Sequence, residues 1–214
     1  MEEYQLDIGK NYESEGVAEW VQEYLGKDFV GVCIDVGAYH SRWLSNSWPM
    51  EQAGWVVWCI EPNPHCAKYL EDRLHVSNYA MGARNEDNVD FYIYNMGHGP
   101  NGEAGATGLL YNKQFDKGFK VMTTTKVDVR TLDWFIENVA KVSYVDYLAI
   151  DTEGTELDVL AGIDLVRWGV KVVAVENFHD RASPGYSVLS DYLRSRGYRR
   201  AVENMVFNEI YVKE

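Results

Sequence analysis

The sequence has few cysteines, no long apolar run and no leader-like N-terminus. Its 214 residues include only Cys33, Cys59 and Cys66, without a CxxC pair. This pattern indicates neither a disulfide framework nor a zinc knuckle. The longest apolar runs, such as Trp55–Ile60, fall far short of the ~20 residues of a membrane-spanning helix. The acidic N-terminus lacks the apolar core of a signal peptide. We therefore predict a soluble, cytoplasmic protein that has no membrane partner.

Basic residues are also scarce. Lys and Arg number 20 against 33 Asp and Glu, which gives a formal net charge of −13. Nucleic acids and anionic membranes select for basic surfaces, so we expect neither as the main partner. Apolar residues at 46% and charged residues at 25% are typical of an ordinary globular protein. A chain of this length can bury a full core without disulfides or a structural metal.

Strand-like apolar segments alternate with segments of helical periodicity. The candidate strands are Phe29–Val36, Trp55–Glu61, His75–Ala80, Val89–Asn95, Lys120–Val129, Tyr144–Ile150, Val170–Val175 and two within Tyr198–Lys213. The candidate helices are Glu13–Leu25, Ser41–Gln52, Pro64–Leu74, Thr131–Val139, Glu153–Leu160 and Ser187–Arg196. This alternation predicts an α/β, Rossmann-like doubly wound fold with a mostly parallel sheet and helices on both faces. The last two strands predict an antiparallel C-terminal edge.

The domain organisation follows from the same pattern. We expect an N-terminal helical segment over residues 1–29 and a single domain over 30–214. Within this domain, residues 96–118 form a glycine-rich insertion, with five glycines among the thirteen residues of Met96–Gly108. A long polar loop in a compact domain is usually functional or disordered. The N-terminal segment either covers the ligand pocket or makes a homodimer contact.

The residues that follow the first two strands point to a ligand. Asp35 and Gly37 end the first strand, and Glu61 ends the second. An acid near this spacing at a second strand can hold a nucleoside ribose. The chain has no GxGxxG phosphate motif, because Asp35 stands where its first glycine would be. An acidic first loop suits a positively charged nucleoside ligand such as S-adenosylmethionine. The alternative is that Gly37 only turns the chain and Glu61 caps the next helix.

Five segments together resemble the FkbM methyltransferases, a class I S-adenosylmethionine-dependent family. They are CIDVGAYHSRWLSNS (Cys33–Ser47), GWVVWCIEPNP (Gly54–Pro64), NYAMGARN (Asn78–Asn85), TLDWFIEN (Thr131–Asn138) and DYLAIDTEGTELDVLAGID (Asp146–Asp164). The last segment is the most specific of the five, and the resemblance runs from about Val30 to the C-terminus. Ser41 departs from the family pattern, since many relatives carry a third glycine there. The resemblance implies the class I methyltransferase fold.

It also implies a set of cofactor-binding residues. Asp35, Gly37 and Ala38 would line the methionine and ribose side of S-adenosylmethionine. Glu61 would bind the ribose hydroxyls, and Pro62 and Asn63 would flank the adenine. The segment that includes Asn78, Ala80 and Met81 would close over the adenine, and Asp151 would face the amino acid end.

Methyl transfer to an alcohol needs alignment of the nucleophile and a group that takes its proton. Our candidates for the catalytic group are Asp151, Glu153, His40 and His179, which all follow strands at the ligand edge. Glu156 lies in the same acidic segment. For this residue we favour a structural role over a catalytic one, because an acid in the first turn of a helix is stabilised by the helix dipole.

Oxygen ligands at two neighbouring strand ends could also hold a metal. Asp151, Glu176 and Asn177 form a candidate Mg²⁺ or Ca²⁺ seat. The alternative is that Glu176 and Asn177 satisfy loop backbone groups.

The sequence therefore predicts an S-adenosylmethionine-dependent methyltransferase. The expected reaction is O-methylation of a hydroxyl on a sugar, glycan precursor or secondary metabolite, with Mg²⁺ as an optional cofactor. The partner would be a small-molecule or glycan acceptor. The alternatives are an N-methyltransferase and a non-catalytic protein that binds the cofactor or regulates on the same fold.

Overall fold

The computed structural model describes residues 16–95, 107–109, 120–177, 185, 187–202 and 208–214. Its main body is a seven-stranded sheet of order β10-β11-β9-β8-β1-β2-β3. These strands are β1 (Val32–Val36), β2 (Val56–Ile60), β3 (Val76–Ser77), β8 (Tyr147–Ile150), β9 (Val172–Glu176), β10 (Tyr198–Arg200) and β11 (Asn208–Lys213). β3, β2, β1, β8 and β9 pair in parallel, and β11 pairs antiparallel with both β9 and β10. The predicted Rossmann-like sheet with its antiparallel C-terminal edge is confirmed.

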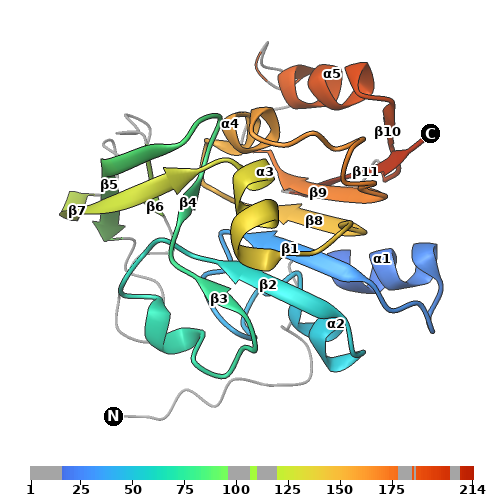
Figure 1. Cartoon of the computed structure of the whole chain (residues 1–214), viewed down its shortest axis with the longest axis horizontal. Helices are drawn as coiled ribbons and strands as arrows, with labels where there is room; N and C mark the ends of the chain where they lie inside the picture. Colours follow the sequence, from blue (N-terminus) through green and yellow to red (C-terminus); the bar gives the residue numbers. More distant parts are fainter. Residues whose placement is uncertain (1–15, 96–106, 110–119, 178–184, 186, 203–207) are drawn as a thin grey trace.

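Helices cover both faces of this sheet (Figure 1). They are α1 (Val17–Leu25), α2 (Trp48–Gln52), the 3-10 turn η1 (Ala67–Tyr69), α3 (Leu132–Phe135), the π-helical turn η3 (Ile136–Ala140), α4 (Glu156–Ala161) and α5 (Ser187–Ser195). The Thr131 hydroxyl accepts a hydrogen bond from the Trp134 N–H and caps α3. None of the helices in these described segments is long and apolar enough to cross a membrane.

Alternate residues of the central strands pack into two separate apolar cores. Ile34 of β1 and Leu148 of β8 pack with residues of α3, α4 and α5. Cys33 and Tyr147, their neighbours in sequence, pack with α1 and α2 on the opposite face. Successive side chains of a strand point to opposite faces, so each buried strand supplies both cores. The central strands are therefore packed on both faces, and this packing holds the strand ends that carry the site in place.

A second sheet lies beside the first, at the left in Figure 1. It has the order β4-β7-β5-β6 and consists of β4 (Ala80–Met81), β5 (Glu86–Asn95), β6 (Thr107–Gly108) and β7 (Lys120–Arg130). The sequence predicts the strands β5 and β7 but not their separation from the main sheet. The predicted strand His75–Ala80 is divided, since β3 joins the main sheet and β4 joins the second one.

Two predicted helices are much shorter than expected. The segment Ser41–Gln52 is helical only from Trp48 onward, with Pro49 in the first turn, where a missing N–H costs no hydrogen bond. The segment Pro64–Leu74 contains only the turn η1. Both segments are instead held by side-chain hydrogen bonds, which periodicity alone does not reveal. The predicted insertion at 96–118 lies almost wholly outside the described residues, as does the start of the predicted first helix.

Candidate active site

The ends of β1 and β8 approach each other closely at Gly37. Gly37 has a φ of +86°, and a side chain there would overlap the backbone carbonyl of Asp151. The Asp151 N–H donates to the Val36 carbonyl at 2.9 Å, which keeps the two strands paired up to this point. Only glycine allows both this φ and this approach. The glycine thereby sets the distance between the chain after β1 and the acidic segment after β8.

Glu61 follows β2 and is buried, with 7% of its surface exposed. Its Oε2 accepts the Tyr39 N–H at 3.0 Å, and its Oε1 accepts the Asn63 N–H at 2.8 Å. Tyr39 has a φ of 46°, so its backbone is in the left-handed region that non-glycine residues seldom adopt. A carboxylate offers about four acceptor positions. The two bonds orient Glu61 and leave acceptor capacity on both oxygens.

Burial raises the pKa of Glu61 to about 7, against the lowering effect of the Asn63 and Tyr39 N–H groups. The negative charges of Asp151 and Asp35 raise it further. Asp35 is itself 5% exposed, and burial raises its pKa as well. Three carboxyl groups from neighbouring strands therefore interact at one edge of the sheet, as the sequence predicts for strand ends.

Asp151 and Glu176 form a pair of carboxyl groups that share a hydrogen bond. Burial and the charge of Asp151 raise the pKa of Glu176 to about 12, so Glu176 is the protonated partner. Burial raises the pKa of Asp151, whereas the bond from Glu176 lowers it. The Oε2 atom of Glu176 is buried and has no hydrogen-bond partner among the described residues. The shared bond therefore places a proton on Glu176 and favours the ionised form of Asp151, which burial opposes.

Glu153 and Glu156 have different environments. Glu153 has a φ of 59°, and burial with the charge of Asp151 raises its pKa to about 9. Glu156 accepts the N–H groups of Thr152 and Gly154 through Oε1, at 3.1 and 2.9 Å. These bonds fix the turn before α4, so Glu156 has the structural role that its position in the sequence favours.

A cavity of about 370 Å³ lies between the end of β2 and the second sheet. Four of the predicted cofactor-binding residues line it, namely Glu61, Pro62, Asn63 and Asn78. Ala80 and Met81 do not, because β4 pairs with β7 and buries both side chains in apolar clusters. That the segment with Ala80 and Met81 closes over the adenine stays a prediction.

Tyr79, from the segment that is predicted to close over the adenine, also lines the cavity. The rest of the wall comes from residues that the sequence does not identify, namely Pro64, Ala67 and, from β7, Thr125, Lys126, Val127 and Asp128. Tyr79 is fixed by Arg130, whose guanidinium carbon lies 5.3 Å from the Tyr79 ring centre and 5.1 Å from that of Trp134. The polar alternation of β7 identifies a strand, but only the packing of the second sheet places it against Glu61.

His40 does not have the geometry of a general base. Its Nδ1 accepts the N–H groups of Arg42 and Trp43, both at 3.1 Å, and its ring stacks on Tyr69. Burial lowers its pKa, so the ring is neutral near pH 7 with its proton on Nε2. Neither nitrogen then has a free lone pair, and we do not assign His40 the base role. His179 lies outside the described residues.

The predicted metal seat of Asp151, Glu176 and Asn177 finds no support. Within the part of the chain that the structure describes, no group of three or more His, Cys, Asp or Glu side chains is arranged to hold a metal ion. Asn177 is buried after β9.

The fold defines the class, since this order of parallel strands with an antiparallel edge is that of the class I methyltransferases. Residues 35–200 match the family model of the methyltransferase FkbM domain, and the chain belongs to this family. The chain is similar to a crystal structure of a methyltransferase FkbM from Methylobacillus flagellatus KT, with 17% identity and a TM-score of 0.51 over 86% of this chain and 43% of that one. It is also 34% identical, over 79 residues, to a protein named Methyltransferase 1 from Beauveria bassiana (strain ARSEF 2860). That match covers 36% of this chain and 31% of the relative, so the chain spans less than half the length of both proteins.

Proposed function

We propose that the chain is an S-adenosylmethionine-dependent O-methyltransferase that acts on a hydroxyl of a sugar, glycan precursor or other secondary metabolite. The observation that supports this most is the group of buried carboxyls at the ends of β1, β2 and β8, of which Glu61 also lines the cavity between the two sheets. Asp35, Glu61 and Asp151 interact electrostatically although burial raises the pKa of each. Such an arrangement costs stability, and a cationic nucleoside with vicinal hydroxyls would offset that cost.

The residues present fit this cofactor. The acceptor capacity that remains on both oxygens of Glu61 suits two donors from a ribose, and Glu61 adjoins the cavity. The carboxyl groups of Asp35 and Asp151 suit the positively charged α-amino group of the amino acid end. S-adenosylmethionine supplies an electrophilic methyl group for an in-line displacement.

The protein's own part in the reaction is to orient the acceptor and remove its proton. The carboxylate of Asp151 is the proposed base, because Glu176 keeps the proton of the pair and holds Asp151 by a hydrogen bond. Glu153, with a pKa of about 9, is neutral near pH 7 and is better suited to donate a hydrogen bond than to accept a proton.

Calorimetric titration with S-adenosylhomocysteine tests the cofactor site. We expect Glu61→Gln to weaken binding at least tenfold, since it removes the charge that the Tyr39 and Asn63 N–H groups orient. Because the pKa of Glu61 is about 7 and binding needs the carboxylate, wild-type affinity should rise about tenfold from pH 6 to pH 8. In Glu61→Gln this rise should be lost.

Glu71→Gln, an exposed carboxylate on the surface, is the matched control and should bind as the wild type does. Absence of binding to folded wild-type protein would contradict the cofactor assignment. If the pH dependence of binding is unchanged in Glu61→Gln, then a group other than Glu61 is responsible for it.

Asp151→Asn separates the O-methyltransferase from the two alternatives. At saturating cofactor, transfer to a hydroxyl acceptor should fall at least about a hundredfold, the usual contribution of a general base. Transfer to an amine acceptor that is neutral at the assay pH would persist, because such a nucleophile needs no strong base. Panels of sugars, alcohols and amines with radiolabelled methyl donor provide the readout. Equal loss on both acceptor types would contradict the base role, and no turnover at all by wild-type protein that binds cofactor would favour the non-catalytic alternative.

A further inference from the structure

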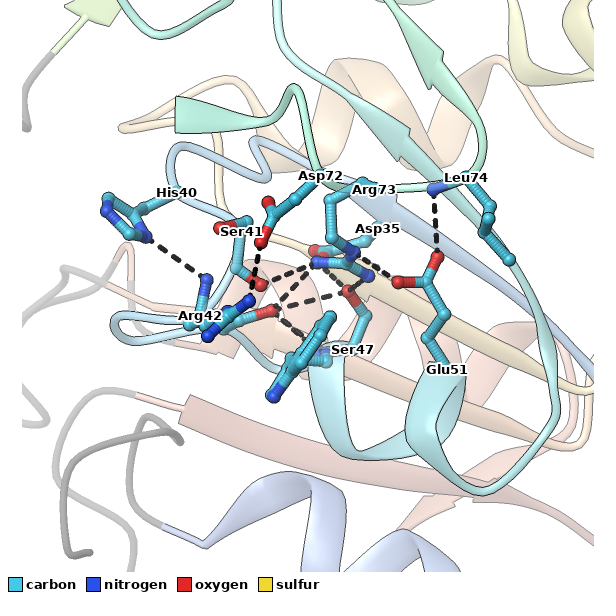
Figure 2. A network of polar contacts seen from close by, with 11 residues as sticks. Asp35, His40, Ser41, Arg42, Ser47, Glu51, Asp72, Arg73 and Leu74 are labelled. Atoms are coloured by element: carbon cyan, nitrogen blue, oxygen red, sulfur yellow. Dashed lines mark hydrogen bonds and ion pairs between the residues drawn. The ribbon is translucent and has the colours of Figure 1, made fainter. Parts of the chain in front are cut away.

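A buried arginine, Arg73, lies close to Asp35, and both side chains bond to the hydroxyl of Ser47. The Arg73 side chain is fully buried and pairs through Nε with Oε2 of Glu51 at 2.9 Å. Figure 2 shows its guanidinium at the centre of a network that joins the loop after β1, the helix α2 and the chain before β3. Sequence reasoning misses Arg73, because it lies near the end of a predicted surface helix that does not form.

The guanidinium binds three groups of the loop between β1 and α2. Nη1 donates to the Ser41 carbonyl at 3.0 Å and to the Ser45 hydroxyl at 3.4 Å, and Nη2 donates to the Ser47 hydroxyl at 3.0 Å. Three groups of one loop therefore surround a single buried cation.

The contact with Ser47 extends to Asp35. An arginine only donates hydrogen bonds, so the Ser47 oxygen must accept from Arg73, and its single hydrogen is left for Oδ2 of Asp35. This bond orients the Asp35 carboxylate and favours its ionised form. The bond from Ser47 and the charge of Arg73 both lower the pKa of Asp35, against burial and the charge of Asp151.

We propose that Arg73 is a positioning residue for the cofactor, which acts through the Ser47 hydroxyl to hold the Asp35 carboxylate toward the amino acid end of S-adenosylmethionine. This inference rests on the proposed function. The inference goes beyond that function because Arg73 acts only through Ser47 and Asp35, and because the expected effect of Arg73 is confined to one end of the ligand.

The test must separate positioning from plain stabilisation. Removal of one partner of a buried ion pair destabilises a protein strongly, but replacement of both by apolar residues is often tolerated. We therefore choose the double variant Arg73→Met/Glu51→Leu, and Ser47→Ala as a smaller change that breaks the same relay. Arg42→Met is the matched control, since it removes the half-exposed pair of Arg42 with Asp72 in the same loop without a bond to Asp35.

Comparison of the affinities for two ligands distinguishes positioning of Asp35 from a purely structural role, which would not affect one ligand more than the other. S-adenosylhomocysteine has the amino acid end, and 5′-methylthioadenosine lacks it. In the double variant and in Ser47→Ala, affinity for S-adenosylhomocysteine should fall at least tenfold, while affinity for methylthioadenosine stays within about twofold of wild type. Arg42→Met should bind both as wild type does. Unfolding by urea establishes that each variant titrated is folded.

Three outcomes are informative. Loss confined to S-adenosylhomocysteine supports the proposal. Equal loss of both ligands, or wild-type affinity for both, overturns it, since the network would then act only on the fold. If the wild-type protein binds neither ligand, the proposed function itself is overturned. This result differs from the one in which wild type and variants bind both ligands equally well, which overturns only the role of Arg73.

Discussion

Gly37→Ala is expected to lower the free energy of unfolding by about 2 to 5 kcal/mol and to abolish binding of S-adenosylhomocysteine. The methyl group would overlap the backbone carbonyl of Asp151, which cannot rotate away because its residue is paired to Val36. A left-handed φ costs a non-glycine residue about 1 to 2 kcal/mol, and overpacking of a well-filled site adds about 1 to 3 kcal/mol. The ends of β1 and β8 would separate, and Asp35 and Asp151 would move with them.

Gly54→Ala is a closely matched control. Gly54 has a φ of +89°, nearly that of Gly37 at +86°, but a side chain there meets nothing within 4 Å. Gly54→Ala should therefore lower the free energy of unfolding only by the cost of the left-handed φ, about 1 to 2 kcal/mol, and should leave cofactor binding intact. Urea unfolding and calorimetry on both variants measure the difference. Equal losses in the two variants would mean that the contact with Asp151 yields easily, and that Gly37 does not set the spacing of the site.

The sequence predicts well those features that depend on local pattern. The buried strands Val32–Val36 and Val172–Glu176 are apolar except for one acid near the end of each, and the order of such segments along the chain is enough to predict a parallel sheet. The acids Asp35, Glu61 and Asp151 could be identified because each stands at, or directly after, the end of such a strand. Parallel strands bring their carboxyl ends to one edge, so three positions far apart in sequence were correctly expected to meet.

The features that the sequence does not reveal depend on contacts between distant segments. The helical spacing of Ser41–Gln52 is real, yet hydrogen bonds to Arg73 hold its first half as a loop. The part of the cavity wall that β7 supplies depends on how the second sheet packs against the first. The spacing of apolar residues along the chain carries no information about this packing. His40 was expected near the ligand as a base, but the two N–H groups that its Nδ1 accepts are visible only in the folded chain.

Glu176→Gln is expected to stabilise the protein without ligand at pH 8 by about 2 to 4 kcal/mol, a large gain for one substitution. The pKa of Glu176 is raised to about 12 in the folded state, against an ordinary value of 4.5 in the unfolded chain. Its contribution to stability is therefore fully present below about pH 4.5 and is lost as the pH rises, because the unfolded chain ionises and the folded protein does not. The amide of glutamine resembles the protonated acid and never ionises.

Urea unfolding from pH 4 to pH 9 measures this effect. Wild type and Glu176→Gln should be similarly stable near pH 4, and above pH 5 the wild-type free energy of unfolding should decline more steeply with pH. Glu23→Gln, an exposed carboxylate on α1, should follow the wild-type curve throughout. If Glu176→Gln is less stable than wild type at pH 8, then Glu176 is ionised in the folded protein, and Asp151 cannot be the sole anion of the pair.

The expected gain also bears on function. Glutamine would satisfy Asp151 by an N–H donor, so the fold has no need of a second acid at the end of β9. An acid kept at a position where an amide is more stable is typical of a site that is shaped for its ligand at the expense of stability. If the gain is found and transfer to hydroxyl acceptors falls in the same variant, the proton held by Glu176 contributes to the reaction. If the gain is found and transfer is unchanged, Glu176 serves only to hold Asp151, and the base role rests on Asp151 alone.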